Sequence, residues 1–74
     1  MLFEFKNLDP VENDGLDRSY NTDHIWSVTP SKNDREKLTI FFTNIRPLTF
    51  YFKSEEDRDN AIKGLREIMG YKII

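Results

Sequence analysis

Residues 37–52, KLTIFFTNIRPLTFYF, decide the fold of this 74-residue chain. Two runs in this stretch alternate large apolar side chains with other residues, as β-strands do, and the turn sequence NIRP separates them. Both runs are rich in the β-branched and aromatic residues that favour strands. The pattern predicts an antiparallel hairpin with one wholly apolar face, formed by Leu38, Ile40, Phe42, Leu48, Phe50 and Phe52.

The apolar period changes from two to 3.6 directly after this hairpin, in KSEEDRDNAIKGLREIMGYK, residues 53–72. Ser54 is placed to cap a helix, with Asp57 three residues later as a variant of the capping box. Gly70 suits the position that follows a last helical turn, and Gly64 permits close approach to a sheet. The expected helix buries one stripe of side chains, formed by Ala61, Ile62, Leu65, Ile68 and Met69.

Two shorter strands are expected before the hairpin. LFEFK at residues 2–6 alternates apolar and charged side chains, as an edge strand would. In HIWSVT, residues 24–29, a strict period of two places Trp26 and Val28 on the core face and Ile25 on the opposite face. The apolar stripe of the helix should cover the face that carries Trp26 and Val28.

Residues 7–23, NLDPVENDGLDRSYNTD, contain five acidic residues and one Arg, together with Asp-Pro and Asn-Asp-Gly turn signals. We expect a long acidic loop, and because no crossover helix separates the strands, they should pair antiparallel. The predicted fold is α+β: one domain, residues 1–74, with a four-stranded antiparallel β-meander and one C-terminal α-helix packed on one face. Its core face is predicted to hold Phe3, Phe5, Trp26, Val28, Leu38, Ile40, Phe42, Leu48, Phe50 and Phe52.

The run FYFKSEEDRDNAIKGL, residues 50–65, resembles the last strand and C-terminal helix of pleckstrin-homology-like domains. In those domains a similar Ser-Glu-Glu cap leads from a strand into an amphipathic helix. The resemblance covers about a fifth of the chain, which has no room for the seven strands of that family and no match to its basic lipid-binding loop. It therefore implies no ligand and no residue role here.

Composition limits the functions that deserve a test. The chain has no Cys, which excludes disulfides, thiol nucleophiles and Cys-based zinc sites, and its net charge of −2 argues against a general nucleic-acid coat protein. No apolar stretch approaches the roughly 20 residues of a membrane span, and no signal-peptide pattern opens the chain. We expect a cytoplasmic protein with no membrane association, and a complete small open reading frame.

Few side chains suggest chemistry. His24 follows Asp23, but adjacent strand residues point to opposite faces, so the pair does not form a general base. Asp9, Glu12, Asp14 and Asp17 are oxygen ligands that suit Ca²⁺, yet their spacing around the turn is not that of an EF-hand. No phosphate loop, nucleophile elbow or dinucleotide fingerprint occurs. We expect no enzyme activity, no catalytic residue, no metal and no cofactor.

The second face of the predicted sheet carries the candidate site. Two aromatic residues lie there among small polar ones, and the acidic loop lies near, so the residues expected to bind a partner are Ile25, Thr39, Phe41, Thr49, Tyr51, Asp14 and Asp17. Tyr and Phe among small polar side chains suit a protein interface, and exposed aromatics also stack single-stranded bases. A solvated face with no partner is the third interpretation.

We expect a small non-enzymatic protein-interaction module, an inhibitor or adaptor of the type that phage and other mobile elements encode. It would act by occupying the surface of a partner protein, which the acidic loop would steer if that partner is basic. The alternatives are single-stranded nucleic-acid binding through the sheet aromatics and self-association through the same face or an edge strand. A monomer or a weak homodimer is expected.

Overall fold

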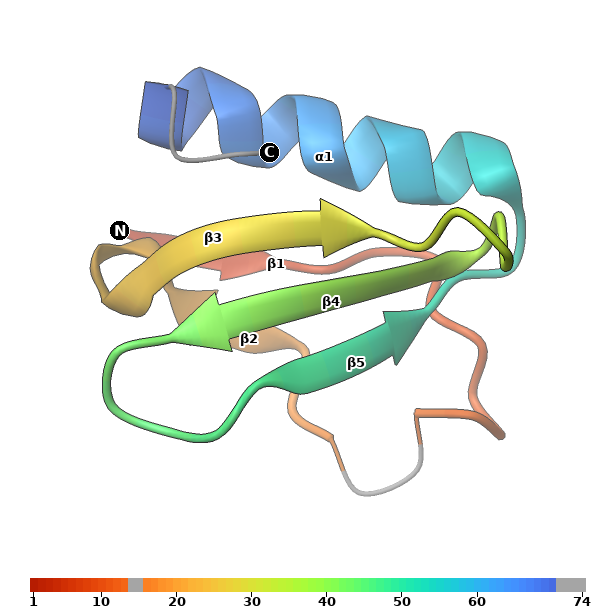
Figure 1. The fold of residues 1–74 in the computed structure, drawn as a ribbon, viewed down its shortest axis with the longest axis horizontal. Helices are drawn as coiled ribbons and strands as arrows, with labels where there is room; N and C mark the ends of the chain where they lie inside the picture. The colour runs from red at the N-terminus through yellow and green to blue at the C-terminus, as the bar shows by residue number, and fades with distance from the viewer. Residues whose placement is uncertain (14–15, 71–74) are drawn as a thin grey trace.

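The computed structural model describes residues 1–13 and 16–70. Its elements, in chain order, are β1 (Leu2–Glu4), β2 (Ser19–Asn21), the 3₁₀ helix η1 (Thr22–His24), β3 (Ile25–Pro30), β4 (Lys37–Phe42), β5 (Leu48–Tyr51) and α1 (Glu55–Met69). The helix α1 lies along one side of the strands (Figure 1). The fold is α+β with antiparallel strands and one C-terminal α-helix, as predicted.

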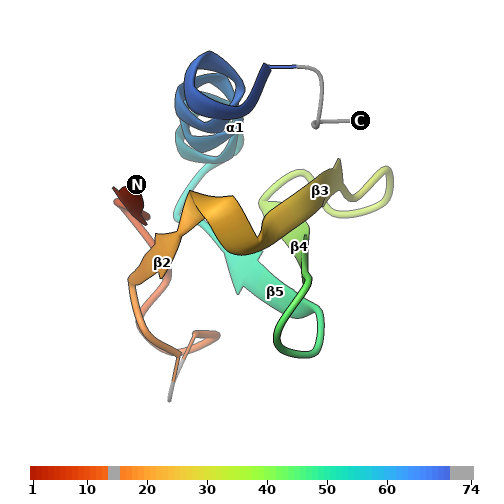
Figure 2. The same ribbon diagram turned by 90° about the vertical axis from the view of Figure 1, so that its left-hand side faces the viewer.

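The strands form two sheets, which corrects the prediction of one four-stranded meander. β1 and β2 pair antiparallel as one sheet, and β3, β4 and β5 form the other in that order. Seen end-on, the two sheets make two walls with α1 above them (Figure 2). The apolar side chains thus lie between three layers: the two-stranded sheet, the three-stranded sheet and α1.

The segment after β1 explains why β1 does not join the larger sheet. Residues 7–13 run along the outer edge of β5, where Leu8 bridges to Phe52 and the Lys53 N–H donates to the Asn7 carbonyl at 2.9 Å. The edge that a fourth strand would need is therefore occupied. The acidic stretch 7–23 is not one long loop, because it contains this edge segment, β2 and η1.

β2 was missed because only one apolar side chain marks it. Tyr20 packs into the aromatic cluster, with its ring centroid 5.3 Å from that of Phe42 and 5.6 Å from that of Phe50. Its neighbours Ser19 and Asn21 are exposed and polar. A three-residue strand with one partly buried side chain has too short a pattern to be recognised by alternation.

A β-bulge in β3 overturns the predicted faces of that strand. Ile25 pairs with Phe42 and Ser27 pairs with Phe41, so Trp26 is an extra residue in the ladder. Before the bulge, Ile25 turns into the core and is 1% exposed, whereas Trp26, predicted to be core, is 54% exposed. Strict alternation holds again from Val28, which is buried as predicted.

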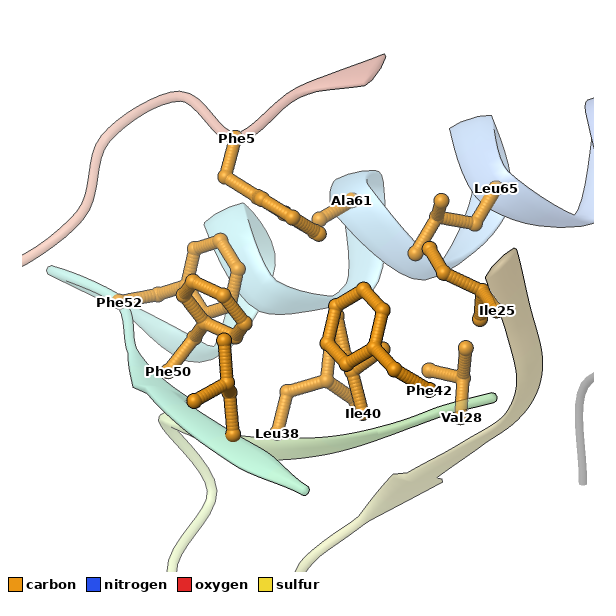
Figure 3. Close-up of a cluster of buried hydrophobic side chains, with 11 residues drawn as sticks. Phe5, Ile25, Val28, Leu38, Ile40, Phe42, Phe50, Phe52, Ala61 and Leu65 are labelled. Atoms are coloured by element: carbon orange, nitrogen blue, oxygen red, sulfur yellow. The ribbon is translucent and has the colours of Figure 1, made fainter. Parts of the chain in front are cut away.

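The core lies between the two sheets and α1, and side chains from all three layers point into it (Figure 3). Apart from Trp26 and the half-buried Phe3, every residue predicted for the core face is buried. On α1, Ala61 and Leu65 are buried, while Ile68 at the edge of the stripe is exposed. The buried apolar set comprises Phe5, Ile25, Val28, Leu38, Ile40, Phe42, Leu48, Phe50, Phe52, Ala61 and Leu65.

The predicted helix caps are confirmed. The Asp57 N–H donates to the Ser54 hydroxyl at 3.1 Å, and the Ser54 hydroxyl donates to the Asp57 carboxylate at 2.8 Å. Gly70 ends α1 with a φ of 69°, a left-handed conformation that glycine adopts without strain. Both ends of the helix are thus fixed by local sequence.

Arg58, which sequence patterns did not single out, fastens the β3–β4 turn to α1. Its guanidinium donates to the carbonyls of Ser31 and Asp34 at 3.3 and 3.4 Å and to the Asp59 carboxylate at 3.1 Å. Arg58 is only 8% exposed despite its charge. The turn between the strands is therefore attached to the first half of the helix.

Replacing Arg58 with Met should lower the free energy of unfolding by about 1–3 kcal/mol, because two turn carbonyls and an acidic neighbour lose their shared donor. Urea denaturation measures the loss. Arg66→Met, at an exposed position on the same helix, is the matched control and should change stability little. Equal losses in both variants would show that Arg58 does not fasten the turn.

Gly64 allows the close approach to β1. A Cβ at Gly64 would lie 3.0 Å from the Cε1 atom of the Phe3 ring. Alanine favours helix by about 1 kcal/mol over glycine, so two effects oppose each other at this position. Gly64→Ala should stabilise the Phe3→Leu variant by about 1 kcal/mol and the native chain by clearly less. A double-mutant cycle tests this, and equal effects in both backgrounds would contradict it.

Candidate functional site

The candidate site is the face of the three-stranded sheet that points away from α1. It is here called the outer face and is formed by Trp26, Ser27, Thr29, Lys37, Thr39, Phe41, Thr49 and Tyr51. At one end the bulge sets Trp26 and Ser27 opposite Phe41. The Trp26 and Phe41 rings lie 5.4 Å apart at 48°, and Ser27 is buried. This end therefore presents an indole ring that is packed on one neighbour and still half open to solvent.

The middle of the outer face is polar. Thr39 and Thr49 are directly paired across β4 and β5, and their hydroxyl oxygens lie 3.4 Å apart. At the far end, the Lys37 Nζ atom lies 5.9 Å from the centre of the Tyr51 ring, within the range of a cation–π contact. Thr29 pairs with Thr39 on the other side, so a row of three threonines separates the two aromatic groups.

Asn13 fixes the acidic segment 9–13 beside Tyr51. Its amide nitrogen donates to the Tyr51 carbonyl at 2.6 Å, and its amide oxygen accepts from the Tyr51 N–H at 2.9 Å. The Asp9 N–H adds a bond to the same carbonyl at 2.9 Å. One side chain therefore replaces a neighbouring strand and holds the acidic segment against the edge of β5.

The predicted site residues divide into three groups. Thr39, Phe41, Thr49 and Tyr51 share the outer face, although Phe41 and Tyr51 stand at opposite ends of it. Ile25 was placed on this face incorrectly, because the bulge turns it into the core. The two predicted acidic residues do not join the face: Asp14 lies outside the described residues, and Asp17 belongs to the neighbourhood of Tyr20.

Among residues 1–13 and 16–70, Tyr20 is the one group whose pKa the fold clearly shifts. Burial raises the pKa of its hydroxyl above the ordinary 10.0, and the Asp17 carboxylate raises it further. The neutral phenol suits a position among the rings of the core. This shift is explained by packing and assigns no chemistry to the group.

Sequence reasoning missed the exposed aromatic residue at one end of the outer face, Trp26, and the residue that organises its margin, Asn13. No local signal announces the bulge, because IWSV fits a regular strand as well as a bulged one. Asn13 acts on a residue 38 positions away in the chain. In the sequence, Asn13 opens the tripeptide Asn-Asp-Gly, which predicts only a turn.

Other kinds of site find little support among residues 1–13 and 16–70. That part of the chain holds no group of three or more His, Cys, Asp or Glu side chains placed to bind a metal ion. His24 is exposed, and its carbonyl accepts a hydrogen bond from the Thr43 N–H at 2.7 Å. None of its helices is long and apolar enough to cross a membrane.

Comparisons with protein-family profiles, curated proteins and solved structures give no match for this chain.

Proposed function

We propose that this protein is a small non-enzymatic interaction module that binds a partner protein through the outer face. The observation that carries the proposal is the position of Trp26. It is 54% exposed, whereas the other aromatic side chains among the described residues are all buried or half-buried. Tryptophan and tyrosine are the residues that most often dominate the binding energy of protein interfaces.

The support beneath Trp26 favours binding at low entropic cost. Its ring is held against Phe41, and the strand below it belongs to a ladder paired along β4. A side chain fixed before binding loses less conformational freedom when a partner covers it. Thr39 and Thr49 next to this pair supply short hydroxyl side chains for polar contacts.

The margin of the outer face suggests the charge of the partner. The Asn13 amide and the Asp9 N–H hold the acidic segment 9–13 against the main chain of Tyr51, so this segment borders the β5 side of the face. A basic contact area would complement it and would associate faster at low ionic strength. A module that works by covering the surface of a cytoplasmic partner can act as an inhibitor or an adaptor, as phage accessory proteins do.

Trp26→Ala should remove partner capture while changing the thermal midpoint little, because the indole adds little to the core. Affinity capture from the source cells, with mass spectrometry of what co-purifies, identifies the partner. Titration of that partner with the native chain and with Trp26→Ala measures the loss of binding free energy. We expect a loss of at least about 2 kcal/mol in binding, as at interface hot spots. Ile68→Ala, an exposed apolar position on α1, is the control that should bind normally.

If Trp26→Ala still captures the partner, the binding site does not lie on the outer face. A collapse of the thermal midpoint would show instead that Trp26 stabilises the sheet, as the interpretation without a partner requires.

Single-stranded nucleic acid is the second candidate, because the Trp26–Phe41 pair resembles a platform on which bases stack. Lys37 is the one basic side chain on the outer face as defined, whereas such sites combine aromatics with basic grooves. Trp26 is the only tryptophan of the chain, so its fluorescence reports directly on this face. Titration with mixed-sequence oligonucleotides at low salt should give no saturable quenching. Saturable quenching that salt reverses would favour the nucleic-acid function instead.

A further inference from the structure

The turn at residues 9–13, here called the Val11 turn, presents an apolar side chain to solvent on a fixed main chain. One carboxylate oxygen of Asp9 accepts the Val11 N–H at 2.9 Å and the Glu12 N–H at 3.1 Å. The Asn13 N–H donates to the Asp9 carbonyl at 3.2 Å, and the Asn13 amide fixes the turn to β5. Val11 is 78% exposed, more than any other large apolar side chain of the described residues. The turn therefore keeps its shape without help from the side chain that it exposes.

The exposed valine is flanked by negative charge. Asp9 lies two residues before Val11, and Glu12, which is exposed, follows it directly. Within residues 1–13 and 16–70, neither carboxylate forms an ion pair. A surface that receives this turn must therefore combine apolar side chains with free cations.

A groove of about 640 Å³ between the end of β3 and α1 has this combination. Pro30 and Ile62, both half-buried, are its apolar side chains. Lys63 and Arg66 are exposed and line it as well. In the part of the chain that the structure describes, neither of these cations forms an ion pair. Both are thus available to a carboxylate that enters the groove.

The other charged side chains of the groove leave this excess of positive charge in place. The Arg58 guanidinium donates to the Asp59 carboxylate at 3.1 Å, so these two charges neutralise each other. Glu67 is the remaining carboxylate of the lining, against the two cations Lys63 and Arg66. The groove is therefore complementary in charge to the Val11 turn.

The Val11 turn and the groove lie on opposite edges of the three-stranded sheet. The strand order is β3-β4-β5, the turn is fixed to the outer edge of β5, and the groove begins at Pro30 in β3. Figure 1 shows α1 above β3 and the orange segment on the other side of the sheet, beyond β5. Because the two surfaces are separate, one copy can offer its turn while its own groove receives another.

We propose that the Val11 turn of one copy of this chain docks in the groove between β3 and α1 of the next copy. Val11 then contacts Pro30 and Ile62, and the Glu12 carboxylate pairs with the cations beside them. Such a contact is heterologous, so no two-fold axis brings the two α1 helices together. Since the surfaces lie on opposite edges, the assembly continues beyond a dimer. The contact is small, so association is weak and requires high protein concentration.

The second copy is the occupant because the chain itself supplies both halves of the contact. The turn contributes an apolar side chain between carboxylates, and the groove contributes apolar side chains between free cations. The hydrogen bonds within the turn fix it before docking, which lowers the entropic cost of the contact. This inference uses no side chain of the outer face. Trp26→Ala should therefore self-associate as the native chain does, even if it loses its partner.

Sedimentation velocity over a concentration series at low salt tests the contact. The weight-average mass of the native chain should rise past that of a dimer at high micromolar concentration. Glu12→Lys should abolish this rise, and so should the double variant Lys63→Glu with Arg66→Glu, because each sets like charges against each other. Arg46→Glu, an exposed charge reversal between β4 and β5, is the matched control and should associate normally.

An equimolar mixture of the two charge-reversed variants distinguishes this contact from a general effect of charge. The basic turn of Glu12→Lys meets the acidic groove of the double variant, and the acidic turn of the double variant meets the basic groove of Glu12→Lys. Association should therefore return in the mixture, although neither variant associates alone. A thermal melt of each variant verifies that it is folded.

Val11→Ser tests the apolar half of the contact without changing any charge. It should weaken association about tenfold, since burial of a valine side chain is worth about that factor. The fold should not change, because Val11 is exposed. Ile45→Ser, at another exposed apolar position, should associate as the native chain does.

Four results would overturn the proposal. The first is a native chain that stays monomeric at every concentration, and the second is a mixture of the charge-reversed variants that does not associate. The third is a native dimer that grows no further, which would require a two-fold contact. The fourth is loss of self-association in Trp26→Ala, which would place the contact on the outer face.

Discussion

The ring of Phe5 stacks on that of Phe50 at 4.5 Å, and this contact joins the two-stranded sheet to the three-stranded one. Phe5 also lies 5.1 Å from Phe3 and 6.1 Å from Tyr20, so a single side chain connects β1, β2 and β5. In a chain of 74 residues without disulfides, such shared contacts must replace a large core. The closure of α1 over the strands and the course of residues 7–13 both depend on the two sheets meeting here.

Where the chain goes after Phe5 determines what the molecule shows to a partner. Residues 7–13 turn back along β5, and Asn13 completes the ladder with its side chain instead of its backbone. The same segment closes an edge of the sheet and lays an acidic stretch of chain along that edge. The protection of the edge and the acidic border of the outer face therefore have a common cause. The rest of that face depends on the bulge, which has no counterpart in β4 or β5.

The accuracy of the sequence predictions followed the length of each periodic signal. The hairpin of β4 and β5 and the helix α1 were predicted nearly to the residue, because each repeats its apolar spacing several times and Ser54 and Gly70 mark the helix ends. Tyr20 alone was too little to reveal β2. At Trp26 the period-two rule gave the wrong face, since one inserted residue reverses the alternation before it. The contact of Asn13 with Tyr51 depends on distant positions in the chain and has no local pattern.

The bulge also separates two demands that usually compete in so small a protein. Ile25 before it and Val28 after it supply the buried contacts of β3, so the side chain at position 26 is released from the packing that holds the strand. Selection can therefore alter that position to recruit a different partner without eroding the thin margin that keeps the chain folded. Because of the extra residue, substitutions at position 26 of β3 can change binding specificity with little loss of stability.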